Sequence, residues 1–322
     1  MKKLLIIAFL LSFATSSFAA MGIRYNPLDG AWYAPADTLF AIMYGKHFSS
    51  SESFTDGNQS RDLTVTQDVA VLRLGFFKDI AGIRTQGSVI FPFGSATADR
   101  KVDLSALSPQ LVVPLNARFS STGLADAEIN YIIRGAAWGE GGANAGYFDI
   151  GGSIFAPIGE YSDNSPVNLG TNRWAFRPLI GMGQNFGPIH LDLFGGADIF
   201  MDNDQYTNNA GTLAASKDYT LSQDPELFAE FHATMFLSAT NKTYISASFG
   251  GVWDGAKTAE KGNSEVKVLG DQETYTARLT IGTSLTKHFS FYTYYAQDLS
   301  AVNGNKGNEF GIRLGLIRLP NE

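Results

Sequence analysis

Residues 172–201, NRWAFRPLIGMGQNFGPIHLDLFGGADIFM, predict two strands joined by a tight turn. One side of the first arm is apolar, and Arg173 and Arg177 lie on the other side. The second arm alternates in the same way and places Asp192 and Asp198 on its polar side. Alternation with period two over about ten residues is typical of a strand that faces lipid outward and water inward. The hairpin therefore predicts a piece of a transmembrane β-barrel.

The same alternation recurs along the chain. With the two arms of the hairpin, the predicted strands number about twelve, and an even number is what bacterial single-chain barrels require. The strand at 288–298 is aromatic on both sides, so its orientation stays open. The other predicted strands cover residues 38–48, 64–76, 83–93, 124–134, 146–157, 226–238, 243–253, 274–284 and 309–318.

The connections between these strands alternate in length. Those after the second, sixth, eighth and tenth strands are short, whereas those after the odd-numbered strands are longer and polar; the connection from Gly135 is intermediate. Short turns at one end and long loops at the other indicate a barrel with both termini periplasmic, and a secreted soluble β-sandwich has no reason to sort its loops in this way. We expect an all-β fold, a closed antiparallel transmembrane up-and-down β-barrel over residues 37–322. Pro178 cannot donate to a strand ladder, so we expect a bulge or a local break there.

The first residues predict export. Lys2 and Lys3 precede an apolar run at 4–11, and small residues stand at Ser17 and Ala19, which is typical of a signal peptide that is cleaved after residue 19. The predicted domains are therefore a signal peptide at 1–19, a periplasmic N-terminal segment at 20–36 and the barrel at 37–322. We expect the segment at 20–36 to lie on the periplasmic side or to fold into the barrel mouth. The predicted location is the cell outer membrane.

Composition excludes several classes of function. The chain has no cysteine, which excludes disulfides and thiolate metal sites, and its net charge of -7 argues against a nucleic-acid partner. No apolar run is long enough for a transmembrane helix. No cofactor is expected. The expected partners are outer-membrane lipid and lipopolysaccharide, the outer-membrane assembly machinery and a small-molecule solute.

Several segments together resemble one family of outer-membrane proteins. They are FPFG at 91–94, STGLAD at 121–126, PIGEY at 157–161, NLGTNRW at 168–174, which is the most specific, then Arg177, Pro178 and Gly181, and QDP at 223–225. The chain resembles the family named for the meta-pathway of phenol degradation, over nearly all of its mature length. That resemblance implies a transporter-like barrel, a channel linked to uptake of aromatic or other small hydrophobic compounds. It carries over no catalytic residues. The ending RLPNE departs from barrels that finish on an aromatic residue, because Phe310 lies further inside.

The polar sides of the predicted strands carry many charged residues. In an aqueous lumen these residues would bind or steer a solute, and the alternative is that they pair across the lumen and plug it. Arg278 and Arg313 have no acidic neighbour on the strand at 288–298 if Tyr292 and Tyr294 face inward, so they predict a basic and aromatic stripe that attracts an anionic or aromatic solute. The predicted lumen-lining residues are Arg73, Arg84, Glu128, Arg134, Asp149, Arg177, Asp192, Glu230, His232, Arg278 and Arg313.

The predicted function is a passive channel or transporter for small solutes. The alternative is a non-conducting structural or surface-interaction barrel. A lipid hydrolase ranks below both: the His-x-Ser triplets at His47 and His288 have the spacing of a His–Ser pair on one strand side, but His47 has no acidic residue on its own strand to orient it. The sequence Asp202–Asn203–Asp204 offers oxygen ligands but lacks the remaining ligands of a calcium loop, so a solvated loop is expected there.

Overall fold

The structure is a computed structural model, and it describes residues 23–29, 34–55, 58–60, 63–102, 115–139, 142–163, 165, 167–208, 216–238, 243–262 and 264–320. The predicted signal peptide at 1–19, and residues 20–22 and 30–33 of the predicted N-terminal segment, lie outside the described residues. None of the described residues forms a helix long and apolar enough to cross a membrane.

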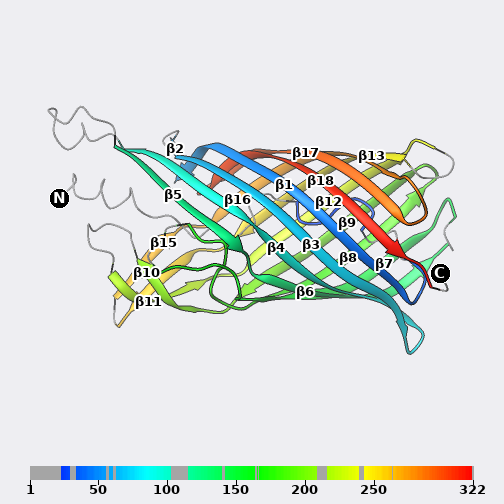
Figure 1. The fold of residues 1–322 in the computed structure, drawn as a ribbon, viewed down its shortest axis with the longest axis horizontal. Coiled ribbons are helices and arrows are strands. Elements are labelled where there is room, and N and C mark those ends of the chain that lie inside the picture. The colour runs from blue at the N-terminus through cyan, green and yellow to red at the C-terminus, as the bar shows by residue number, and fades with distance from the viewer. Residues whose placement is uncertain are drawn as a thin grey trace.

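Twelve antiparallel strands close into a barrel (Figure 1). The last strand pairs with the first from Leu39–Arg318 to Ser53–Asn305, so the sheet has no free edge, as a sheet in hydrocarbon requires. The prediction of a closed antiparallel barrel is confirmed. Its strands are β1 (Thr38–Thr55), β3 (Leu63–Ile80), β4 (Ile83–Val102), β6 (Ala127–Trp138), β7 (Gly146–Ala156), β8 (Ala175–Phe186), β9 (Ile189–Phe200), β12 (Glu226–Phe236), β13 (Thr243–Asp254), β16 (Gln272–Ser284), β17 (Phe289–Val302) and β18 (Asn305–Arg318).

The side-chain alternation of most strands is the one the sequence predicts. On β9, Leu193 is 46% exposed on the outer surface whereas Asp192 is 1% exposed on the inner side. On β12, Leu227 and Phe231 face outward while Glu230 and His232 are buried inside. The apolar outer surface is the face that lipid covers. On β17, whose orientation the sequence left open, Tyr292 and Tyr294 face the lumen.

The inner surface of β1 is aromatic rather than charged. Phe40, Ile42 and Tyr44 face inward and form one buried cluster with Phe48 of β1 and with Tyr292 and Tyr294 of β17. We call the inner faces of β1, β3, β17 and β18 the aromatic wall. Several of its rings lie flat on a glycine of the next strand: Tyr294 is paired with Gly311, where a Cβ atom would meet the ring at 2.3 Å. The glycines let the rings lie against the sheet, so the rings do not fill the lumen.

At one end of the barrel the strands continue beyond the predicted limits. We call this the loop end; the opposite end, where β1 begins and β18 ends, is the terminal end (Figure 1). The connections predicted as polar loops at 49–61, 94–123, 202–224 and 254–272 are largely strand, and only residues 303–304 separate β17 from β18. The sequence missed these extensions because their apolar residues are few and spread over short strands; in the second sheet Tyr206, Leu221, Ala259 and Val268 form one small buried cluster. The added strands are β2 (Asn58–Ser60) and β5 (Leu115–Leu124), and a second sheet of β10 (Asn203–Asn208), β11 (Ser216–Gln223), β14 (Lys257–Lys261) and β15 (Ser264–Leu269).

Two strands are interrupted. At Pro178 the pairing of β8 with β9 skips Arg177 and Pro178 and resumes at Leu179 without any change of register, so the structure has a local break and no bulge. The predicted strand at 124–134 is divided into β5 and β6, and both pair with β4.

Candidate functional site in the barrel lumen

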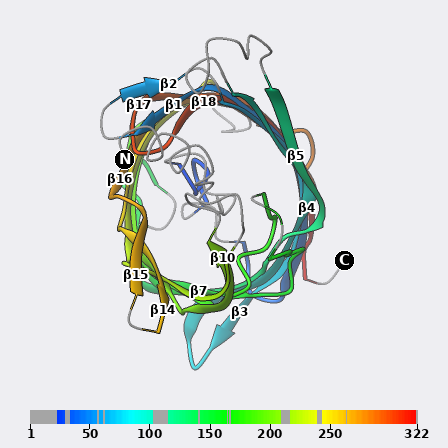
Figure 2. The same ribbon diagram turned by 90° about the vertical axis from the view of Figure 1, so that its left-hand side faces the viewer.

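Residues 23–29 lie inside the barrel, where Figure 2 shows them as the blue segment within the ring of strands. The backbone amides of Arg24 and Tyr25 donate hydrogen bonds to the carboxylate of Glu230, the second at 2.9 Å. Further along, the amide of Leu28 donates to Asp192 at 3.1 Å. The segment therefore docks through its backbone onto inward-facing acids of β9 and β12, at a greater depth than the mouth of the barrel.

The side chain of Arg24 completes this docking. Its guanidinium pairs with Asp198 of β9 and Glu226 of β12. Arg177 of β8 reaches the same Asp198 with two hydrogen bonds of 2.6 and 2.8 Å. All of these side chains are nearly inaccessible to solvent, and buried charges persist only when they are paired. We call the inner faces of β8, β9 and β12 the ion-pair wall.

Three arginines stand on a different part of the inner surface. Arg73 of β3 donates to Ser88 and Asn130, Arg278 of β16 donates to the carbonyl of Tyr25, and Arg313 of β18 donates to Ser290. Each guanidinium also lies over an aromatic ring: Phe40, Tyr294 and Tyr292 at 5.6, 5.1 and 5.2 Å respectively. None of the three forms an ion pair with a described residue, in contrast to Arg24 and Arg177. The predicted basic and aromatic stripe is present as a geometric feature.

The remaining predicted lumen residues contact side chains of neighbouring strands. Arg134 pairs with Asp149 at 2.7 Å, and Tyr147 donates to Asp192 at 2.5 Å. Glu128 accepts from Ser153, and His232 contacts Ser248 at 2.7 Å through Nδ1. Arg84 differs from the others because it lies at the rim of the terminal end, where it pairs with Asp79 and binds the carbonyl of Ala34.

Two cavities remain in the lumen beside the N-terminal segment. One, of about 400 Å³, lies toward the terminal end and is bordered by Phe77 of β3 and Arg313 of β18. The other, of about 280 Å³, lies toward the loop end and is bordered by Arg177, Phe48 and other residues. Asp29 and Arg73 line both cavities, so the two spaces adjoin at these residues. Of the predicted lumen residues, Arg73, Glu128, Arg177 and Arg313 border one or both cavities.

The family segments of the sequence meet at one point in the wall. The carboxylate of Asp126, in the break between β5 and β6, accepts hydrogen bonds from the amide of Gly159 at 3.0 Å and from the amide and hydroxyl of Thr171 at 2.7 and 2.6 Å. Gly159 and Gly170 approach so closely that a Cβ on either would lie 2.7 Å from the other's backbone. The motif residues thus pin the connection between β7 and β8 against the inner wall.

A family model described as "Putative MetA-pathway of phenol degradation" matches residues 49–314. The chain belongs to this family. No curated protein matches. Among solved structures, an outer membrane channel from Pseudomonas putida F1 is 19% identical, with a TM-score of 0.75, and the match covers 92% of this chain and all of that one. The translocator domain of the autotransporter NalP from Neisseria meningitidis is 12% identical, with a TM-score of 0.45 over 89% of this chain and 91% of that one, and no argument follows from that likeness.

In this phenol-degradation family member, the sequence analysis missed the residues that occupy the lumen. Arg24, Tyr25, Leu28 and Asp29 were not singled out, because they precede the first strand and show no alternation. The charges of the strands nevertheless indicate that another segment must enter the lumen. The inner faces of β9 and β12 carry four acids, Asp192, Asp198, Glu226 and Glu230, against the single arginine of β8, and this excess of buried acid requires a cation from elsewhere in the chain.

The two His-x-Ser triplets of the barrel differ in their surroundings. His47 contacts Asp68 at 2.7 Å through Nδ1, so the acidic partner missing from its own strand is supplied by β3. Both side chains are more than half exposed. His288 instead contacts the carbonyl oxygen of Ile317 at 3.0 Å.

The described residues contain no group of acids and histidines suited to a metal ion. Asn203 of the Asp202–Asn203–Asp204 sequence is 1% exposed and hydrogen-bonds to Tyr161, Thr171 and Asn172. It therefore has a structural position within the sheet at the loop end and does not sit in a solvated loop.

Proposed function

We propose that this barrel is a passive outer-membrane channel for small solutes, with aromatic and other small hydrophobic compounds as the class it passes. The observation that carries this proposal is the pair of adjoining cavities beside the N-terminal segment. They run along the aromatic wall, whose rings and glycines leave space that a packed core would fill. The neighbour from Pseudomonas putida F1 carries the description of an outer membrane channel, which supports the same class of function.

In this proposal the terminal end faces the periplasm and the loop end faces outward, in contact with lipopolysaccharide. The support comes from the lengths of the connections. Turns of two residues join β3 to β4 and β8 to β9 at the terminal end. A two-residue turn also joins β17 to β18 at the loop end, but the second sheet and the longest connections are there. Short periplasmic turns and long outer loops are the rule for such barrels, which reach the membrane through the assembly machinery.

A specific observation favours one rival function. At the height of Arg177, Arg24 lies inside the barrel and pairs with Asp198 and Glu226, so part of the lumen is closed by buried ion pairs. If this segment never moves and the cavities beside it stay disconnected, the barrel is a non-conducting structural or surface-interaction protein.

Planar-bilayer recording of the purified mature chain separates the two functions. The channel proposal expects a small, steady single-channel conductance in the wild type, and a conductance several-fold larger after deletion of residues 23–29. Liposome swelling with uncharged aromatic solutes should follow the same order. Heat-modifiable mobility in gels shows whether both proteins are folded. If both are folded and neither conducts, the channel proposal is contradicted and the structural barrel is supported.

A further inference from the structure

The cavity toward the terminal end has an unusual balance of charge. Arg73 of β3 and Arg313 of β18 border it on either side of β1, and neither guanidinium is paired with a carboxylate of the described residues. The Nε atom of Arg313 is buried without a hydrogen-bond partner among the described residues, and its guanidinium donates a long hydrogen bond of 3.4 Å to Ser290. Two cations in a confined space of low dielectric favour the entry of an anion.

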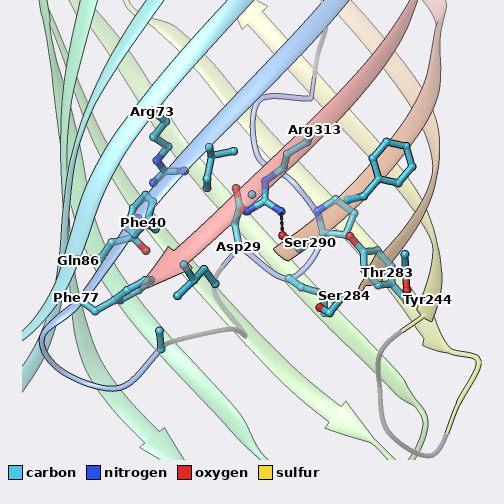
Figure 3. A pocket seen from close by; sticks show the side chains of 17 residues that line it. Asp29, Phe40, Arg73, Phe77, Gln86, Tyr244, Thr283, Ser284, Ser290 and Arg313 are labelled. Atoms are coloured by element: carbon cyan, nitrogen blue, oxygen red, sulfur yellow. Dashed lines mark hydrogen bonds between the residues drawn. The ribbon is translucent and has the colours of Figure 1, made fainter. Parts of the chain in front are cut away.

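Among the described residues, Asp29 is the one acid that borders this cavity, and it belongs to the N-terminal segment rather than to the barrel. Figure 3 shows it between Arg73 and Arg313. Its Oδ2 atom accepts hydrogen bonds from the amide and the side chain of Asn26, at 3.2 and 3.1 Å. The carboxylate is thus held by its own segment, and it offers the two arginines negative charge without an ion-pair contact.

The rest of the cavity is suited to a ring. Phe40 and Phe77 border it together with Leu28, and its volume of about 400 Å³ falls within the range of small-molecule sites. Aromatic side chains stack with an aromatic ring, and a guanidinium binds a carboxylate through two parallel hydrogen bonds. The cavity therefore combines the two kinds of contact that a single-ring carboxylic acid needs.

We propose that this cavity is a binding site for an aromatic monocarboxylate, and that Asp29 holds the place of the solute's carboxylate when the site is free. The inference rests on the proposed channel function and names the class of solute that this site recognises. The solute's ring packs against Phe40 and Phe77, and its carboxylate takes the position between Arg73 and Arg313. Repulsion between the two carboxylates pushes Asp29 away from the two arginines, so binding loosens this end of residues 23–29.

Benzoate is the probe, with benzyl alcohol as its uncharged match and benzylamine as its cationic match. Binding is measured by calorimetry on the full mature chain in detergent, which does not depend on conduction. We expect benzoate to bind at least about tenfold more tightly than benzyl alcohol, because charge-assisted hydrogen bonds to arginine add to the shared packing of the ring. Benzylamine should not bind.

Four variants test the named atoms. Arg313→Gln should weaken benzoate binding about tenfold and leave benzyl alcohol unchanged. Arg313→Lys keeps the charge but loses the two-pronged geometry, so its affinity should lie between those of the wild type and Arg313→Gln. Asp29→Asn removes the competing carboxylate and should tighten benzoate binding several-fold. Arg84→Gln is the matched control at the same end of the barrel, because Arg84 lies outside the cavity, and benzoate affinity should not change.

Equal affinity for benzoate and benzyl alcohol would overturn this proposal, as would an Asp29→Asn variant that binds benzoate no better than the wild type. These results differ from a failure of the channel proposal, which would appear as absent current in bilayers. If benzoate binds as expected but the protein does not conduct, the binding-site proposal stands and the channel proposal is wrong.

Discussion

The arginines on the two walls of the lumen differ in whether they are paired with a carboxylate. On the ion-pair wall, Arg177 and the incoming Arg24 share Asp198, and every guanidinium has a carboxylate within contact distance. On the aromatic wall and its neighbour β16, Arg73, Arg278 and Arg313 lie over aromatic rings and bind only neutral oxygen atoms. Charge pairing therefore holds the N-terminal segment on one side of the barrel, while the arginines of the other side have no carboxylate partner among the described residues and can meet an anionic solute.

The largest expected effect is on stability. Arg177→Gln leaves Asp198 with one partner instead of two, and breaking a buried ion pair costs about 3–5 kcal/mol in free energy of unfolding. Arg313→Gln, on the aromatic wall, removes no ion pair and should cost about 1 kcal/mol or less. Urea unfolding of the refolded protein in lipid vesicles measures both. Equal losses of unfolding free energy in the two variants would show that the ion pairs do not make the ion-pair wall more sensitive to substitution than the aromatic wall.

The next effect concerns the docking of residues 23–29. Arg24→Gln removes the cation that Asp198 and Glu226 share, so the segment should leave the ion-pair wall more often. We expect larger current fluctuations in bilayers and faster proteolytic cleavage before the first strand. Arg24→Lys keeps the charge and should show a smaller change of the same sign. If the Arg24→Gln segment remains as protected as in the wild type, its backbone hydrogen bonds to Glu230 and Asp192 are sufficient for docking.

Ion selectivity tests whether the unpaired arginines of the aromatic wall act on a solute. The double variant Arg73→Gln, Arg313→Gln removes two unpaired cations next to the cavities, and the reversal potential in a salt gradient should shift toward cation preference. A double variant at Arg134 and Asp149 removes one charge of each sign and should leave the reversal potential near its wild-type value. A shift of similar size in both proteins would show that pairing does not decide selectivity.

The smallest expected effect lies outside the lumen. The exposed His47–Asp68 pair has Ser49 two residues away on β1, which is the composition of a hydrolytic triad. The channel proposal expects Ser49→Ala to change neither the current nor the rate of phospholipid hydrolysis by the refolded protein. A wild-type hydrolysis rate that the Ser49→Ala substitution abolishes would restore the hydrolase alternative.

The short motifs that carry the family resemblance lie far apart in sequence, and in the structure several of them are in contact. Asp126 and Thr171 lie 45 positions apart in sequence and are joined by hydrogen bonds of 2.6 and 2.7 Å. Sequence showed that these residues occur together with glycines at 159 and 170, but their contact depends on the break between β5 and β6, which leaves no trace in the alternation.

The barrel follows from local patterns in the sequence. Alternating apolar and polar residues specify a lipid-facing and a lumen-facing side for each strand, and the sorted connections specify how consecutive strands pair, because these signals are local. Only the tertiary structure decided how the lumen is filled. Arg24 meets Asp198 across 174 positions of sequence, and Asp29 comes between Arg73 and Arg313 only once the barrel has closed around it. Pairing of buried charges selects a partner by distance in space, and a pattern read along the chain carries no such distance.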